Sequence, residues 1–228
     1  MWNRTENKIK LVLIRHAATK SNKEHRYLGK TDESLSTDGI NELKKNKKII
    51  SYPKIDYLFT SPMKRCLETA KILYPDKDEI IIPDWKEMDF GEFEGKNYSE
   101  LSKDERYQQW IDSNGTLPFP KGESTEEFVA RCRRGLYSML SKIDIDLSDG
   151  EHRSCTQEKN IHKYSTQQII TAGLIIHGGT IMSLISSFYG GNYFDYQVAN
   201  GMGYICNMIY DNDTIKIDSL KKLYDNIT

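Results

Sequence analysis

Two kinds of hydrophobic pattern alternate along the chain. Short, nearly continuous apolar runs, typical of strands buried on both faces, occupy residues 9–14, 55–60, 79–82 and 169–176. Helical patterns lie between and after them, at residues 36–51, 61–74, 123–143 and 181–188. Strands that alternate with helices predict an α/β fold. We expect a single three-layer α/β/α domain over residues 1–228, with a mostly parallel central sheet.

Capping residues predict where three of these helices begin. Ser36 is a suitable N-cap, and Ser61 followed by Pro62 is a typical N-cap and first helical position. Residues 124–127 read S-T-E-E, which fits a capping box. At the other end, Pro75 is expected to terminate the helix that Ser61 begins.

Two segments in the second half of the chain depart from the alternation. Residues 204–210 and 214–219 are apolar runs joined by D-N-D, which predict a hairpin at the edge of the sheet. Residues 144–168 are mostly polar and have no hydrophobic period. We therefore expect a surface loop or a mobile insertion there.

Composition narrows the classes of partner. The 228 residues include 32 Lys plus Arg and 33 Asp plus Glu, a formal charge of −1. The chain therefore lacks the excess of positive charge that binding to nucleic acids or anionic membranes usually requires. No apolar run reaches the ~18–20 residues that span a bilayer, and residues 1–10 lack the apolar core of a signal peptide. We expect a cytoplasmic protein with no nucleic-acid or membrane partner; monomer and homodimer are both left open.

Cysteine and histidine spacing matches no standard metal site. The four cysteines are Cys66, Cys132, Cys155 and Cys206. They form no C-x-x-C pair, so we expect small core residues in a reducing compartment. His152 and His162 flank one of them, again without a standard ligand spacing, and no metal is expected.

Polar residues that suit anion binding follow directly on the predicted strands. They are Arg15 and His16 after the first strand, Ser61 and Arg65 after the second, and His177 after the strand that ends at residue 176. In parallel sheets, ligands bind outside the carboxyl ends of the strands, beside helix N-termini whose N–H groups favour anions. The two histidines and two arginines are therefore expected to form one oxyanion site, most economically a phosphate site.

The residue types then indicate phosphoryl transfer through histidine. The chain has no G-x-x-x-x-G-K-[ST] loop, no cysteine five residues ahead of an arginine, and no evident carboxylate cluster for two metals. A neutral imidazole can accept a phosphoryl group, while arginines stabilise its charge. The leaving alkoxide needs a proton. Four carboxylates after the third strand are candidates, and composition does not choose among them: Glu87, Asp89, Glu92 and Glu94.

Six short motifs occur in order along the chain. Residues 15–22 read R-H-A-A-T-K-S-N, and residues 61–70 read S-P-M-K-R-C-L-E-T-A. These resemble the R-H-G-[EQ]-T-x-x-N and S-P-x-x-R-x-x-x-T-A motifs of the histidine phosphatase superfamily, also called the phosphoglycerate mutase-like family. Further matching segments are 29–39, 87–95, 122–124 and 176–179.

The resemblance implies roles for individual residues. It implies that His16 accepts the phosphoryl group, that Glu87 is the proton donor and then the base for water, and that Glu94 is structural. The residues that it implies for the phosphate pocket and substrate are Arg15, Arg65, His177, Asn22 and Gly178. Neither a metal nor a cofactor is required in this family.

The resemblance also bears on the substrate. Ala17 and Ala18 depart from the family motif, so we expect an altered pocket. The compact segment 95–124 resembles the phosphatase branch, particularly α-ribazole phosphatases, which favours hydrolysis of a small phosphorylated metabolite, with α-ribazole 5′-phosphate suggested. The alternatives are a mutase-type phosphoryl transfer on phosphoglycerate and a non-catalytic phosphoryl-binding regulatory protein. Tyr107 and Trp110 either cover an aromatic leaving group or belong to the core.

Overall fold

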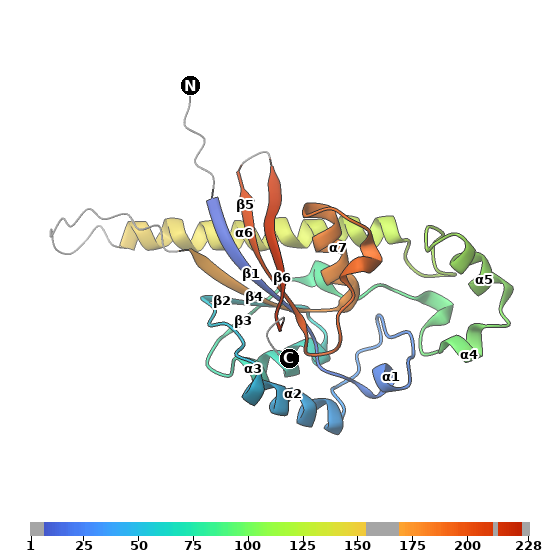
Figure 1. Ribbon diagram of the computed structural model, residues 1–228. Helices are drawn as coiled ribbons and strands as arrows, with labels where there is room; N and C mark the ends of the chain where they lie inside the picture. Colours follow the sequence, from blue (N-terminus) through green and yellow to red (C-terminus); the bar gives the residue numbers. More distant parts are fainter. Residues whose placement is uncertain (1–6, 154–168, 212–213, 225–228) are drawn as a thin grey trace.

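Six strands form one sheet in the order β3-β2-β4-β1-β5-β6 (Figure 1). The computed structural model describes residues 7–153, 169–211 and 214–224. Its strands are β1 (Asn7–Arg15), β2 (Tyr57–Thr60), β3 (Glu79–Ile81), β4 (Ile170–Ile176), β5 (Gly203–Tyr210) and β6 (Ile215–Lys222). Strands β1 to β4 are parallel, whereas β5 and β6 form an antiparallel hairpin beside β1. The prediction of a mostly parallel sheet with an edge hairpin is confirmed.

Alternate residues of β1 face opposite sides of the sheet. Leu11 and Leu13 belong to one hydrophobic cluster, and Val12 and Ile14 belong to another. The first cluster includes residues of α6 (Thr125–Arg153) and α7 (Gly178–Phe188), the second those of α2 (Thr37–Ile49) and α3 (Lys64–Leu73). Figure 1 shows the two pairs of helices on opposite sides of the sheet. Burial on both faces explains the continuous apolar run, and the three-layer arrangement is confirmed.

Short elements connect the strands to these helices. They are α1 (Lys20–Lys23), α4 (Tyr98–Leu101), α5 (Glu105–Asp112) and the 3₁₀ turns η1 (Pro83–Trp85), η2 (Gly91–Phe93) and η4 (Tyr193–Tyr196). Helices α4 and α5 project away from the sheet, at the right of Figure 1. The chain that leads to them leaves β3 at the carboxyl end of the parallel strands, so this outlying part is connected to the rim where ligands are expected.

Two of the three predicted helix caps are confirmed. The hydroxyl of Ser36 accepts a hydrogen bond from Gly39 N at the start of α2, and Ser124 exchanges bonds with Glu127 at the start of α6. Ser61 is not an N-cap, because α3 begins after Met63. Its hydroxyl instead lies 2.7 Å from Nε2 of His177, the residue between β4 and α7, so a distant partner replaces the local cap. Helix α3 ends at Leu73, before the predicted stop at Pro75.

Helix α6 is longer than the sequence pattern predicts. It continues through Arg153, so the expectation of an irregular segment that starts at residue 144 is wrong for its first ten residues. Extending an existing helix adds one hydrogen bond for each residue fixed, without a new nucleus, and this does not require an apolar stripe. Residues 154–168 lie outside the described part of the chain, as do the side chains of His152, Cys155 and His162.

The cysteines that the structure describes are core residues. Cys66, Cys132 and Cys206 are buried and unpaired, as predicted, whereas Cys155 lies outside the described residues. Over the described ranges, no helix is long and apolar enough to cross a membrane. The cytoplasmic location stays a prediction.

Candidate active site

The carboxyl ends of β1, β2 and β4 lie side by side. Arg15 is in register with Ile176, and Thr60 with Ile175, so the residues that follow these strands share one rim. The rings of His16 and His177 are both buried, with centroids 5.2 Å apart and planes at 68°. The structure therefore brings the two histidines together.

One hydrogen bond fixes which nitrogen of His16 is free. Its Nδ1 lies 2.7 Å from the carbonyl oxygen of Ala17. A carbonyl oxygen only accepts, so Nδ1 carries the proton and Nε2 keeps its lone pair. Burial lowers the pKa of His16 well below its usual value, and the charges of Arg65 and Arg15 lower it further. His16 is therefore a neutral imidazole with a free Nε2, the form that attacks phosphorus.

His177 has the opposite tautomer. Arg65 Nε donates to its Nδ1 at 3.3 Å, so Nε2 carries the proton and donates to Ser61 Oγ at 2.7 Å. Burial, followed by the charge of Arg65, lowers the pKa of His177 well below its usual value. The thiol of Cys66 packs against the same ring, with Sγ 3.6 Å from Nε2. His177 is thus held as a neutral hydrogen-bonding group.

Arg65 is completely buried, and each guanidinium nitrogen has a partner. Besides its bond to His177, it donates to Thr31 O at 2.9 Å and Gly29 O at 2.8 Å. These bonds tie α3 to the loop after α1. The charge of Arg65 thereby stays in the interior, beside both histidines.

Arg15 has a donor to spare. Its Nη1 donates to Val198 O at 2.8 Å, but its Nε is buried and has no hydrogen-bond partner among the described residues. An unpaired buried N–H costs about 1–3 kcal/mol. Burial lowers the pKa of Arg15, partly offset by the nearby Glu87. An anionic oxygen at this point would satisfy the donor and stabilise the charge.

Glu87 is distinguished from the other candidate carboxylates by its position. Its Oε1 accepts from Met88 N at 2.9 Å and its Oε2 from Gly179 N at 3.3 Å, at the start of α7. Burial raises its pKa, although these two bonds and Arg65 oppose the rise. A Cβ atom at position 179 would lie 2.5 Å from Oε1, so a side chain there would displace the Glu87 carboxyl group from its present position. A carboxyl group with a raised pKa suits a general acid.

The other three carboxylates are engaged elsewhere. Asp89 pairs with Lys30 at 3.0 Å, and Glu92 pairs with Arg106 at 2.5 Å. Glu94 accepts from the backbone N–H groups of Gly29 and Thr31, each at 2.9 Å, which fits the structural role that the family resemblance implies. The geometry thus separates one candidate acid from three carboxylates that shape loops.

Asn22 and Gly178 lie at the edges of this arrangement. Asn22 Oδ1 accepts from Thr19 N at 3.2 Å and from Asn200 Nδ2 at 3.1 Å, which leaves the Nδ2 of Asn22 as its donor. Asn200 also donates to His16 O at 3.0 Å. Gly178 begins α7, against the Arg15 side chain. Sequence reasoning missed Asn200, because nothing near it in the chain indicates chemistry.

Ala17 and Ala18 contribute backbone groups. Both are buried. Ala17 N donates to Thr69 Oγ1 at 3.0 Å while its carbonyl orients His16, and Ala18 O accepts from Ser36 N at 3.0 Å. These bonds do not depend on the side chain at either position, so the two departures from the family motif leave the orientation of His16 intact.

A cavity of about 610 Å³ opens beside Arg15 and Glu87. Besides those two residues, Gly178 and Gly179, its wall is mainly apolar and aromatic. The aromatic residues of the wall are Tyr27, Phe90, Trp110, Phe119, Tyr193 and Phe194. Such a wall suits an apolar or aromatic leaving group. Of these residues, the sequence singles out Trp110 alone, as one that could cover an aromatic leaving group.

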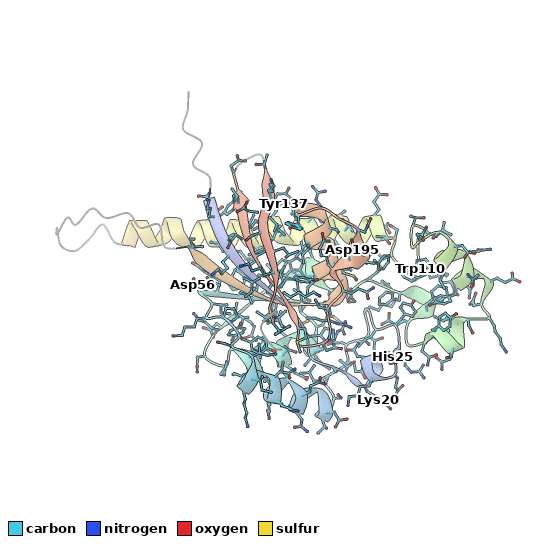
Figure 2. The ribbon with its side chains drawn as sticks, viewed as in Figure 1. Lys20, His25, Asp56, Trp110, Tyr137 and Asp195 are labelled. Carbon is cyan, nitrogen blue, oxygen red and sulfur yellow. The ribbon has the colours of Figure 1, made fainter. Side chains whose placement is uncertain are left out.

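Tyr107 and Trp110 have different surroundings. Tyr107 is buried, and its hydroxyl lies 2.9 Å from that of Tyr27. Trp110 lines the cavity and packs on Phe119, with ring centroids 4.7 Å apart. Figure 2 labels Trp110 on the side from which α4 and α5 project. Tyr107 therefore belongs to the core, whereas Trp110 contributes to the wall.

No metal cluster is seen where side chains are described. Across residues 7–145, 169–211 and 214–224, no three His, Cys, Asp or Glu side chains are grouped to hold an ion. The positive charge of the site comes from Arg15 and Arg65.

Comparisons with known proteins identify the family. The sequence profile of the histidine phosphatase superfamily (branch 1) matches residues 11–144, more than half of the chain. A putative alpha-ribazole-5′-P phosphatase from Escherichia coli K-12 MG1655 has a TM-score of 0.72 at 20% identity, over 97% of this chain and 100% of that chain. The alpha-ribazole phosphatase from Shigella flexneri has a TM-score of 0.67 at 20% identity, over 96% and 100%.

A phosphoglycerate mutase from Thermus thermophilus has the same fold, with a TM-score of 0.59 at 23% identity over 93% of this chain and 98% of that chain. At these low identities the TM-scores show a shared fold, and the profile match shows the family. Together with two facing histidines at the ends of parallel strands, they lead to one conclusion: this chain belongs to the histidine phosphatase superfamily.

Proposed function

We propose that this protein is a phosphomonoester hydrolase that works through a phosphohistidine at His16 and needs no metal. One observation carries the proposal. Arg15, with its unpaired Nε, and Glu87 line one cavity, and the neutral His16, with its free Nε2, directly follows Arg15 at the end of β1. They supply the nucleophile, a donor for the phosphoryl oxygens and a proton for the leaving group.

The first half of the reaction transfers the phosphoryl group to the protein. His16 Nε2 forms a bond to phosphorus, the bond from phosphorus to the leaving oxygen breaks, and the protonated Glu87 gives its proton to that oxygen. Arg15 and Arg65 stabilise the charge on the transferring group. Because Nδ1 of His16 donates to Ala17 O throughout, the positive charge that develops on the ring is also stabilised.

The second half regenerates the site. Water attacks phosphorus, Glu87 now takes the proton of that water, and the bond between nitrogen and phosphorus breaks. Phosphate leaves, while His16 is again neutral and Glu87 again protonated. One carboxyl group therefore serves as acid and then as base, as its raised pKa favours.

The cavity wall supports a substrate with an apolar or aromatic leaving group. Phe90 and Phe119 meet edge to face at 5.1 Å, and the ring of Trp110 packs at a tilt against Phe119. α-Ribazole 5′-phosphate carries a fused aromatic base and fits this description, as the names of two structural neighbours also suggest. The predominantly apolar wall is less suited to phosphoglycerate, whose carboxylate would have to enter it.

The test is a trapping experiment with a ³²P-labelled phosphomonoester in EDTA, quenched in alkali. We expect an acid-labile adduct that is lost in His16→Ala, together with a fall in turnover of at least ~10⁴-fold, as for loss of a nucleophile. The matched control is His25→Asn, because His25 is an exposed histidine (Figure 2) outside the site, in a left-handed conformation that asparagine tolerates.

Each alternative has its own outcome. A mutase would pass the label to a second phosphoglycerate rather than to water. A phosphoryl-binding regulatory protein would bind the ester without forming an adduct. If the wild type forms no adduct and hydrolyses no phosphomonoester in EDTA, the proposed function is wrong.

A further inference from the structure

The backbone around Glu87 converges on one guanidinium group. Glu87 lies in a loop just after η1, with no helix or strand to hold it. Arg131 Nη1 donates to Asp84 O at 2.8 Å and Lys86 O at 2.6 Å, and its Nη2 donates to Glu87 O at 3.0 Å. A single side chain of α6 therefore binds three carbonyl groups in the stretch that ends at the candidate acid.

The carboxylate of Glu123 orients Arg131 and also binds the loop that follows Glu87. Glu123 binds Arg131 Nε at 2.6 Å and Nη2 at 2.8 Å, in a bidentate pair whose side chains are only 15–16% exposed. Glu123 also accepts from Asp89 N at 3.3 Å, and its own N–H donates to Asp89 O at 2.9 Å. The Arg131–Glu123 pair thus contacts the loop on both sides of Glu87. A planar guanidinium can donate several hydrogen bonds in fixed directions, which the ammonium group of a lysine cannot do.

The same turn of α6 also supports the carboxyl group of Glu87. Phe128, one turn before Arg131, lies under its guanidinium at 4.7 Å. A Cβ atom at Gly179 would lie 3.1 Å from the Phe128 ring, and Gly179 N donates to Glu87 Oε2. Helix α6 therefore binds the Glu87 backbone through Arg131, and its Phe128 ring lies close to Gly179, the residue whose N–H binds the carboxylate.

We propose that Arg131, oriented by Glu123, is a positioning residue that holds the Glu87 carboxyl group at the leaving oxygen of the substrate. The inference rests on the proposed function and adds to it two residues that do not line the leaving-group cavity. A general acid acts only within hydrogen-bond reach of its target, and a displacement of about 1 Å can cost ~10²-fold in rate.

The expected consequence depends on the leaving group. A nitrophenolate leaves without a proton, whereas the alkoxide of 2-phenylethyl phosphate needs one; both carry a ring that suits the cavity. Arg131→Met is expected to lower kcat/KM for 2-phenylethyl phosphate at least ~10-fold more than for nitrophenyl phosphate. Arg131→Lys, which retains the charge, is expected to fall between Arg131→Met and wild type on this ratio.

The matched control is Arg134→Met, on the next turn of the same helix. The Arg134 side chain is 62% exposed and pairs with Asp84 at 3.3 Å. We expect its replacement to leave the ratio of the two substrates unchanged. Trp85 is buried and donates to Cys132 O at 3.2 Å, so we expect η1 to stay attached to α6 in every variant.

A double mutant separates positioning from general damage. In a Glu87→Gln background, the acid that Arg131 positions is absent, so adding Arg131→Met should cause no further loss on 2-phenylethyl phosphate. The inference is overturned if Arg131→Met costs as much in that background as it does when Glu87 is present, or if the single variants lose equally on both substrates. A wild type that hydrolyses neither substrate overturns the proposed function instead.

Discussion

The phosphoryl end of the site and its leaving-group end are built in different ways. The phosphoryl end consists of residues that follow β1, β2 and β4, where Arg65 and His177 have hydrogen-bond partners on both sides. The leaving-group end consists of aromatic side chains from segments far apart in the sequence, such as Phe90, Trp110 and Phe194. In the proposed mechanism, residues at the ends of the strands carry out the chemistry and the connecting segments select the substrate.

After loss of the nucleophile His16, the largest effect is expected at Glu87, where the two ends meet. Glu87→Gln should lower turnover of an alkyl phosphate about 10³-fold, the usual scale of general acid catalysis, and that of a nitrophenyl phosphate much less. The measurement is kcat/KM for both esters. Equal losses would show that Glu87 does not protonate the leaving group.

The pH dependence of the rate is a second test of Glu87 as the proton donor. The acid must be protonated, so the rate on an alkyl phosphate should fall as pH rises through the raised pKa of Glu87. His16 must be neutral, and its lowered pKa places the acidic limb below the usual histidine range. Glu87→Gln should abolish the alkaline limb, and its persistence would assign that limb to another group.

Substitutions at the phosphoryl end are expected to have a smaller effect, which does not depend on the leaving group. Arg65→Lys and His177→Ala should each lower kcat at least ~10²-fold on every phosphomonoester. Arg65→Lys removes the guanidinium donors beside the phosphoryl acceptor, and His177→Ala removes the imidazole that orients Arg65 and packs against His16. Lys64→Ala is the control, since the Lys64 side chain is exposed next to Arg65. Thermal unfolding of each variant separates lost catalysis from lost stability. A loss confined to one leaving group would contradict the division between the two ends.

The smallest effect is expected at the aromatic wall. Trp110→Leu should raise KM for an aryl phosphate about tenfold, since one aromatic contact contributes roughly 0.5–1.5 kcal/mol beyond its area, and leave methyl phosphate unaffected. Tyr137→Ala is the matched control, because Tyr137 is a half-exposed aromatic residue on α6 (Figure 2). Equal changes for both esters would mean that the leaving group binds elsewhere.

Much of the fold, and most of the phosphoryl end, could be predicted from where the strands end in the sequence. The continuous apolar run of β1 indicates burial on two faces, and the residue after such a strand must emerge at the rim. Arg15 and His177 could therefore be placed without knowledge of any contact. The same reasoning misplaced the start of α3, because the Ser61 hydroxyl bonds to His177, 116 positions away.

The rest depends on contacts that leave no local signal. Glu87 differs from Asp89 through its burial and its bond from Gly179 N, whereas Asp89 pairs with Lys30. In the sequence, Arg131 looks like an ordinary helix arginine. Its role depends on the carbonyl groups of residues 84, 86 and 87, which only the folded chain brings to it. The cavity wall likewise forms only when segments far apart in the sequence, from Tyr27 to Phe194, fold together.

The thiol of Cys66 bears on how this site responds to oxidants. Peroxides and alkylating agents attack thiolates, and burial raises the pKa of Cys66 to about 12, so the sulfur against His177 stays protonated and shielded. The reacting group of the proposed mechanism is an imidazole nitrogen. A sulfur atom thus packs against the reaction centre without making phosphoryl transfer sensitive to the redox state of the surroundings.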